Sequence, residues 1–145
     1  MFPEPLSLRR ATKMTSNILR RVSITVITIL SLVIIFHLLI LSGVIPYAIV
    51  WGGRLTSTNE MITFEAISIV LNMMMIVIVA QHSGLLRLPV KAIVSRIGVW
   101  IMVLLFALNT VGNLMSVNET ERMIFTPLTL ILSVLCLMLA LRKRA

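Results

Sequence analysis

Four long runs of apolar residues, separated by short polar stretches, dominate the chain. They cover about residues 22–42, 61–81, 97–115 and 123–141. Each run holds roughly the 20 residues that an α-helix needs to cross a hydrocarbon core of about 30 Å. The pattern therefore predicts an all-α membrane protein, in which four transmembrane helices form an antiparallel bundle with short loops.

The composition agrees with this prediction and leaves residues 1–145 as one transmembrane domain. The chain is 59% hydrophobic and only 12% charged, whereas soluble domains carry about twice that charged fraction. A net charge of +8 would favour nucleic-acid binding in a soluble protein. Here the basic residues flank the apolar runs, so we interpret them as topology determinants and lipid head-group contacts, and we expect no nucleic-acid partner.

The distribution of basic residues predicts the orientation. Residues 1–21 hold five of them, the connection between the second and third spans three, and the carboxyl end three. Eleven of the thirteen thus lie on one side, which leaves Arg54 and Arg122 on the other. Basic residues accumulate on the cytoplasmic side, so both termini are expected there, with residues 1–21 as a basic tail. The first span is too long for a cleaved signal peptide and is expected to remain as an anchor.

Two helix boundaries are left open by the sequence. After the first span, either the helix continues with a kink at Pro46, or a short interfacial segment that contains Tyr47 and Trp51 follows. Pro127 belongs either to the first turn of the fourth helix or to the interior of a helix that begins near Asn118. Asn118 and Glu121 stand at capping-box spacing, which favours the second version.

Glu65 is a carboxylate that falls inside a predicted span. Glu65, Ser68 and Asn72 lie at positions i, i+3 and i+7, so they share one helix face. An ionisable group in hydrocarbon costs roughly 2.5 kcal/mol or more, so it normally turns toward other helices or water. A rise of about 1.5 Å per residue places polar residues of the other spans in the same outer half of the bilayer. These residues are His37, Asn109, Asn113 and Thr126.

This cluster predicts an outward-facing polar cavity that binds a proton, a small cation or a lipid head group. The candidate binding residues are Glu65, His37, Asn72, Asn109, Asn113, Arg54 and Arg122. In a transport version Glu65 carries the charge, while His37 and Asn72 line its path. Arg54 and Arg122 then screen what enters. A single four-helix bundle has little room for a through-pore, so a channel or carrier would require a homo-oligomer.

The polar residues also have a purely structural interpretation. Asn, Ser, Thr and His side chains join helices through hydrogen bonds worth about 0.6 kcal/mol each. Glu65 would then reach the head groups or pair with Arg54 or Arg122. A stripe of small residues, which indicates a packing seam, runs along the fourth span at Thr126, Thr129, Ser133, Cys136 and Ala140. The alternative function is a non-catalytic accessory or assembly subunit that packs against a larger membrane complex through this seam.

Motifs for several chemistries are absent from the sequence. It contains no Gly-rich phosphate loop, no nucleophile elbow, no HExxH motif, no paired cysteines and no aspartate. His37 and His82 lie at opposite ends of the predicted bundle, so they cannot ligate one metal ion or one haem within a subunit. We therefore expect no enzyme, no metal and no cofactor.

Several short stretches carry a resemblance. WGGRL at residues 51–55, Glu60-Met61, Phe64-Glu65 and the run over residues 109–127 resemble small bacterial four-span membrane proteins that are known mostly as uncharacterised hypothetical proteins. The resemblance implies the bacterial inner membrane as the location, and it implies no reaction. It directs attention to Trp51, Gly52, Gly53, Arg54, Glu65, Asn109, Gly112, Asn113, Glu121, Arg122 and Pro127.

Overall fold

The computed structural model describes residues 6–47, 50–53 and 55–141. In these residues the structure has the α-helices α1 (Leu6–Leu41), α2 (Thr58–Ser83), α3 (Ala92–Leu114) and α4 (Glu119–Ala140), and the 3-10 turn η2 (Trp51–Gly53). The described residues contain no strand. Each α-helix contains a segment that is long and apolar enough to cross a membrane. The predicted all-α fold with four membrane-spanning helices is confirmed at this level.

Local sequence signals explain where α2 and α4 begin and end. The side chain of Ser57 caps α2 by accepting a hydrogen bond from the Glu60 N–H, and Gly84 ends it with a left-handed φ of 76°. The side chain of Asn118 caps α4 by accepting from the Glu121 N–H. The helix thus begins near Asn118, and Pro127 lies in its interior.

The first helix is longer than its apolar run at the start and does not continue to Pro46. It includes most of the basic segment before residue 22, and the part suited to the membrane is Ser16–Leu41. After Leu41 the backbone turns at Gly43, whose φ is 78°. Of the two predicted endings, the structure therefore has the one in which Pro46 lies in a separate segment after the helix.

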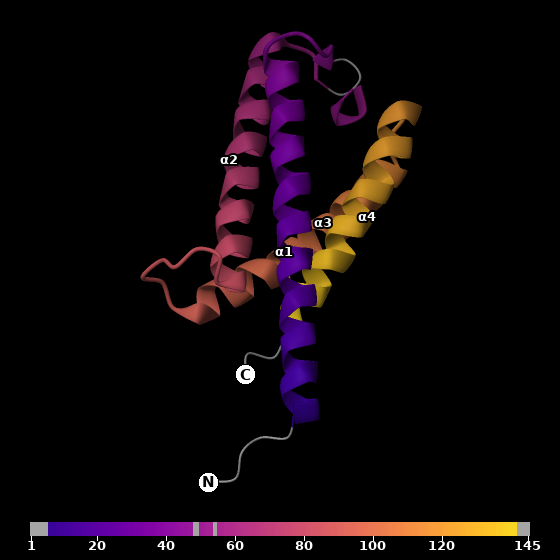
Figure 1. The fold of residues 1–145 in the computed structure, drawn as a ribbon. Coiled ribbons are helices and arrows are strands. Elements are labelled where there is room, and N and C mark those ends of the chain that lie inside the picture. The colour runs from indigo at the N-terminus through magenta and orange to yellow at the C-terminus, as the bar shows by residue number, and fades with distance from the viewer. Residues whose placement is uncertain (1–5, 48–49, 54, 142–145) are drawn as a thin grey trace.

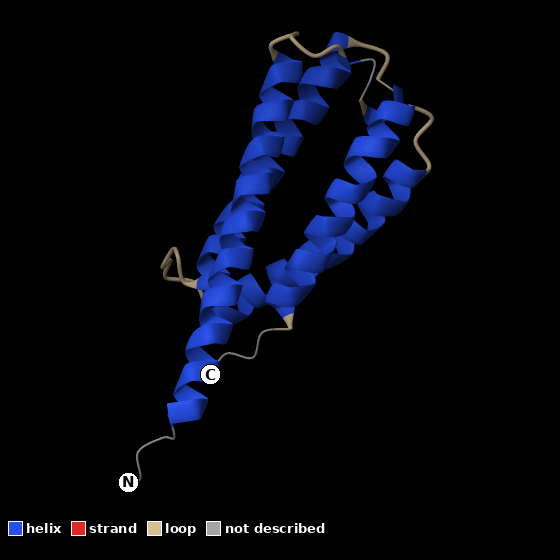
Figure 2. Ribbon diagram, turned by 45° about the vertical axis from the view of Figure 1, so that its right-hand side comes forward, coloured by secondary structure: helices blue, strands red, loops and turns tan. Residues whose placement is uncertain are grey.

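The helices are arranged as two pairs (Figure 1). α1 packs extensively along α2, and α3 along α4, whereas α2 meets α3 and α1 meets α4 over shorter stretches. The α1–α2 connection (residues 42–57) and the α3–α4 connection (residues 115–118) lie at the same end, here named the two-loop end (Figure 2). The two pairs diverge toward this end and approach each other away from it.

The main hydrophobic core lies where the two pairs approach each other, and we name this region the packed half. Its buried residues come from all four helices and are Val22, Val26, Leu30, Met75, Val79, Val99, Met102, Phe106, Leu132, Cys136, Leu139 and Ala140. Gly98 brings α3 close to α2, because a Cβ at that position would lie 2.8 Å from Cγ2 of Ile78. A smaller cluster of Ile40, Val50 and Met61 packs α1 and α2 together at the two-loop end.

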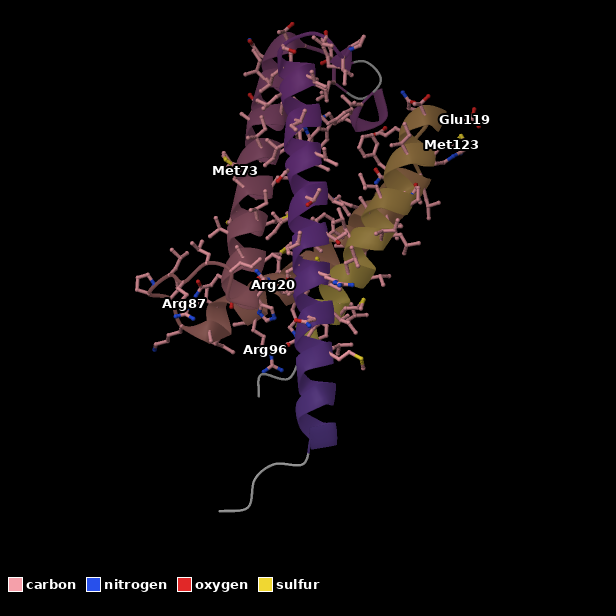
Figure 3. All side chains as sticks on the ribbon, in the orientation of Figure 1. Arg20, Met73, Arg87, Arg96, Glu119 and Met123 are labelled. Atoms are coloured by element: carbon pink, nitrogen blue, oxygen red, sulfur yellow. The ribbon has the colours of Figure 1, made fainter. Side chains whose placement is uncertain are left out.

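Charged side chains divide between the two ends of the molecule (Figure 3). Arg20, Arg87 and Arg96 lie toward the end opposite the two-loop end, whereas Glu119 lies at the two-loop end. Arg54 and the basic residues 142–144 lie outside the described residues.

Candidate functional site

Glu65 lies on the buried face of α2. The buried residues of this helix are Met61, Glu65, Ser68, Met75, Val79 and His82, and their spacing of three and four residues is that of one helix face. Glu65 has an exposed fraction of 0%. A buried carboxyl group is costly unless its oxygens have partners, so the groups around it decide what it does.

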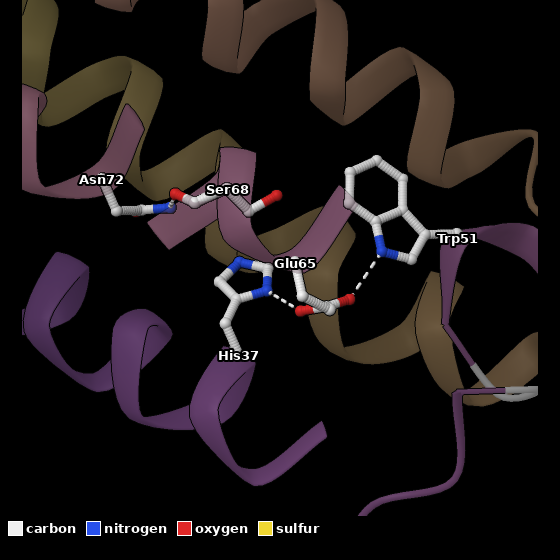
Figure 4. Close-up of polar contacts among 5 residues, drawn as sticks. All are labelled: His37, Trp51, Glu65, Ser68 and Asn72. Atoms are coloured by element: carbon white, nitrogen blue, oxygen red, sulfur yellow. Dashed lines mark hydrogen bonds and ion pairs between the residues drawn. The ribbon is translucent and has the colours of Figure 1, made fainter. Parts of the chain in front are cut away.

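Two side chains from other parts of the chain contact the Glu65 carboxyl group (Figure 4). Nδ1 of His37, near the end of α1, lies 2.5 Å from Oε2. Nε1 of Trp51, in η2, donates a hydrogen bond of 2.8 Å to Oε1. Each oxygen thus has one partner, and a carboxylate can accept more than one hydrogen bond at each oxygen. The group is anchored while keeping unused acceptor capacity.

The α1–α2 connection brings Trp51 into this position. The chain turns at Gly43 and again at Trp51, whose φ of 56° is in the left-handed region. Non-glycine residues rarely adopt that region, and they do so at a cost that other contacts must offset. Here the offsetting contacts are the hydrogen bond to Glu65 and ring packing on Phe64, with ring centroids 5.0 Å apart.

Glu65 and His37 line a cavity of about 340 Å³ between the two helix pairs. We name the part of the bundle that surrounds this cavity the cavity half. This volume is within the range of about 300–1,000 Å³ that is typical of ligand pockets. The cavity reaches the surface, because Asn109 lines it and is exposed. Its polar lining residues are His37, Trp51, Glu65, Ser68, Asn72, Asn109, Asn113, Glu121 and Thr129. Met75, Phe106 and Leu132 belong to both the cavity wall and the main core, so the packed half borders the cavity.

Five of the seven predicted binding residues line this cavity: His37, Glu65, Asn72, Asn109 and Asn113. Two of the three asparagines also make hydrogen bonds within the bundle. Nδ2 of Asn72 donates to the Ser68 carbonyl oxygen at 2.8 Å, and Nδ2 of Asn113 to Oγ1 of Thr129 at 3.3 Å. Asn72 and Asn113 thus combine a structural contact with a place in the cavity wall.

Arg122, one of the two predicted arginines, does not join this group. Arg122 lies 3.5 Å from the Glu119 carboxylate, and both side chains are well exposed. Arg122 is not a lining residue of the cavity, and the suggestion that it pairs with Glu65 is wrong, because Arg122 pairs with Glu119, while the partners of Glu65 are His37 and Trp51. Arg54, the other predicted arginine, lies outside the described residues.

Sequence reasoning missed two residues of the site, Trp51 and Glu121. It assigned Trp51 to the head-group region and Glu121 to a helix cap, although the resemblance pointed to both. Glu121 does take part in the cap of α4, and its Oε2 also accepts a hydrogen bond of 2.7 Å from Ser116. Both residues line the cavity. The described lining residues therefore include two carboxyl groups and no lysine or arginine.

The small-residue seam of α4 packs against α3. Oγ of Ser133 donates to the Val103 carbonyl oxygen at 3.2 Å, and Oγ1 of Thr110 donates to Thr129 at 3.0 Å. Cys136 is fully buried. The middle of the seam, at Thr129 and Ser133, thus contacts α3 within the chain.

Comparisons with known proteins give no family for this chain. No protein-family model, no curated protein and no solved structure matches it. Among the described residues there is also no group of three or more His, Cys, Asp or Glu side chains that could hold a metal ion. The function is therefore inferred from the chemistry of the cavity.

Proposed function

We propose that the chain is a four-span antiparallel bundle of the bacterial inner membrane, with both termini in the cytoplasm, and that its cavity binds a cationic ligand group at Glu65. The orientation is supported by the excess of basic residues in the two end segments and in the α2–α3 connection. In this orientation the two-loop end faces outward, and the cavity lies in the outer half of the bilayer.

One observation carries the proposal: a fully buried carboxyl group forms part of a cavity wall. Intramembrane ionisable residues are costly and are usually functional. His37 and Trp51 each contact one Glu65 oxygen, and a carboxylate oxygen can accept a further hydrogen bond from a ligand. With Glu121 as the second carboxyl group and no described lysine or arginine in the lining, the charges present favour a positive ligand.

The aromatic lining favours an organic ammonium over a metal ion. Phe36, Trp51, Phe106 and Phe125 all line the cavity, and aromatic faces attract ammonium groups by about 0.5–2 kcal/mol each. A volume of about 340 Å³ is far larger than a bare ion requires. Of the proton, small cation and lipid head group considered from the sequence, a small amine or an amine head group fits these features best.

The position of the cavity supports binding rather than conduction by a single chain. Met75, Phe106 and Leu132 separate it from the other end of the bundle as part of the main core. Passage through the monomer would require this core to open. Transport would therefore depend on an oligomer or on a rearrangement of the two helix pairs.

A binding titration tests the proposal. Butylammonium is added to the purified protein in lipid nanodiscs, and the fluorescence of Trp51 is followed in a Trp100→Phe background. We expect a saturable change whose affinity falls at least tenfold in Glu65→Gln, because hydrogen bonds to charged groups are worth about 1.5–3 kcal/mol.

Two controls accompany this titration. Glu119→Gln removes a carboxylate with 77% side-chain exposure near the same end and should leave the affinity unchanged. Butanol tests whether the positive charge is needed. Equal responses to butanol and butylammonium, or an unchanged affinity in Glu65→Gln, would contradict the proposed function.

A further inference from the structure

A second cavity, of about 500 Å³, lies between α1 and α4, and we name it the α1–α4 groove. Its lining is almost wholly apolar, with Ile29 and Leu32 from α1 and Ile124 from α4. Residues 44–46 of the α1–α2 connection also line it. Leu32 is 59% exposed and Ile124 is 55% exposed, so the groove opens on the outside of the bundle.

The groove and the Glu65 cavity share a wall. The residues that line both are Val33, Phe36, Val50, Glu121, Phe125 and Leu128. Within this wall the rings of Phe36 and Phe125 lie with centroids 5.2 Å apart. A ligand that fills both spaces would pass between side chains of this wall, with the apolar groove on one side and the Glu65 carboxyl group on the other.

The surroundings of the groove indicate what fills it. Its α1 residues belong to the segment Ser16–Leu41, which is suited to cross the membrane. In that region the solvent is hydrocarbon, and an empty groove would forfeit the dispersion contacts of its lining. Lipid tails are as apolar as the lining itself, so apolar contact alone gives a hydrocarbon chain no preference for this groove over the bilayer. A preference has to come from the head group that the chain carries.

We propose that the α1–α4 groove takes the hydrocarbon chain of a bilayer amphipath whose ammonium head group lies in the cavity against Glu65. The proposal rests on the proposed function and adds the ligand class and its route, which is lateral entry from the membrane between α1 and α4. The carboxyl group that would bind the ammonium and the apolar groove that would bind the hydrocarbon chain lie on either side of the shared wall. An alkylammonium ligand requires two such neighbouring surfaces. The groove runs about 10 Å along α1 from Ile29 to Phe36, which is the depth available to the chain.

Native mass spectrometry in a non-ionic detergent tests this assignment with three probes: dodecylammonium, butylammonium and dodecanol. The probes separate the contribution of the charge from that of the chain. Ile124→Phe partly fills the groove, because Ile124 lines the groove and not the cavity. Leu130→Phe is the matched control, because Leu130 is 53% exposed on the same helix and lines neither.

We expect one dodecylammonium per chain, bound at least tenfold more tightly than butylammonium or dodecanol. Ile124→Phe should remove most of the advantage of the long chain, leave butylammonium binding unchanged and keep the protein folded by circular dichroism. Leu130→Phe should change neither affinity. These results together would show that the dodecyl chain of the ligand lies in the α1–α4 groove.

Three outcomes would overturn the assignment. If butylammonium binding depends on Glu65 but the long chain adds no affinity, or Ile124→Phe has no effect, the groove does not hold the chain and the proposed function stands. If butylammonium does not bind, or binds equally well to Glu65→Gln, the proposed function fails and the assignment fails with it. A dimer that Ile124→Phe dissociates would show that a second copy of the chain covers the groove.

Discussion

The two histidines of the chain, His37 and His82, lie in different halves of the bundle and have different kinds of partner. In the cavity half, His37 contacts an ionisable side chain, with Nδ1 at 2.5 Å from Oε2 of Glu65. In the packed half, Nε2 of His82 lies 3.1 Å from the backbone carbonyl oxygen of Leu139, and His82 is 6% exposed. His82 thus joins α2 to α4 through a polar contact in the packed half, whereas His37 forms part of the cavity wall in the cavity half.

The lining of the two halves explains this difference. Inward positions of the packed half carry apolar side chains such as Val26, Val79 and Val99, each with 0% exposure, and these fill the space between the helices. Inward positions of the cavity half include Ser68, Asn72 and other polar groups, which can hold water or a ligand. A polar residue in a span is therefore informative about function only together with its partner and the space beside it.

The largest predicted effect is a loss of stability on truncating the packed half. Leu30→Ala removes a side chain with 0% exposure from the main core and should lower the free energy of unfolding by about 2–5 kcal/mol. Leu71→Ala, at a cavity-lining position with 37% exposure, should cost less than about 1 kcal/mol. Unfolding by sodium dodecyl sulfate in mixed micelles measures both. Equal costs would show that the halves are packed alike.

Overpacking the contact between the helix pairs should have the next largest effect. Gly98→Leu places a side chain where a Cβ alone lies 2.8 Å from Ile78, so we expect a loss of about 1–3 kcal/mol. Gly112→Leu is the control on the same helix, because a Cβ there meets nothing within 4 Å. The same unfolding assay compares them. If Gly98→Leu is tolerated as well as Gly112→Leu, the close approach of α2 and α3 does not hold the pairs together.

Removing the Trp51 donor should have a smaller and local effect. Trp51→Phe keeps an aromatic ring beside Phe64 but removes the hydrogen bond to Glu65, which should cost about 1.5 kcal/mol, the lower end of the range for a hydrogen bond to a charged group. Amide hydrogen exchange should become faster in the α1–α2 connection and stay unchanged in the packed half. Faster exchange in both halves would contradict a local role for this residue.

The smallest predicted effect concerns the polar contact between α3 and α4. Thr110→Val removes the 3.0 Å hydrogen bond to Thr129 and should cost about 0.6 kcal/mol, the average for such contacts in membranes. The affinity for butylammonium should not change, because Thr110 does not line the cavity. A titration and an unfolding curve on the same sample check both statements, and a large loss of affinity would place Thr110 closer to the ligand than the structure does.

The sequence predicted the features that depend on residue type and spacing along one helix. Apolar run length predicted the four helices, spacing predicted the shared face of Glu65 and Ser68, and cap chemistry favoured the start of α4 near Asn118. It could not predict contacts that depend on the path of a connection. Trp51 reaches Glu65 because the backbone turns at Gly43 and at Trp51 itself, and no periodic pattern encodes such a path.

The cavity was also beyond sequence reasoning in its details. Depth estimates placed His37, Asn109 and Asn113 in the same outer half, but the cavity between the helices results from the divergence of the two helix pairs (Figure 2). The direction in which the α4 seam faces depends on helix rotation, which composition does not determine. The distribution of basic residues predicted on which side of the membrane each of them lies, but not which residues they contact. The pairing of Arg122 with Glu119 was therefore not predicted.

Cysteine accessibility tests most directly the proposal that the cavity half holds an outward-facing ligand cavity and the packed half a closed core. In a Cys136→Ala background, Ser68→Cys places a thiol in the cavity wall and Val99→Cys places one in the main core. A membrane-impermeant methanethiosulfonate that carries an ammonium group is added to the outside of intact cells. We predict that Ser68→Cys reacts, that butylammonium slows the reaction at least tenfold, and that Val99→Cys stays unmodified. Equal reactivity at the two positions, or a Ser68→Cys reaction that butylammonium does not slow, would contradict the account.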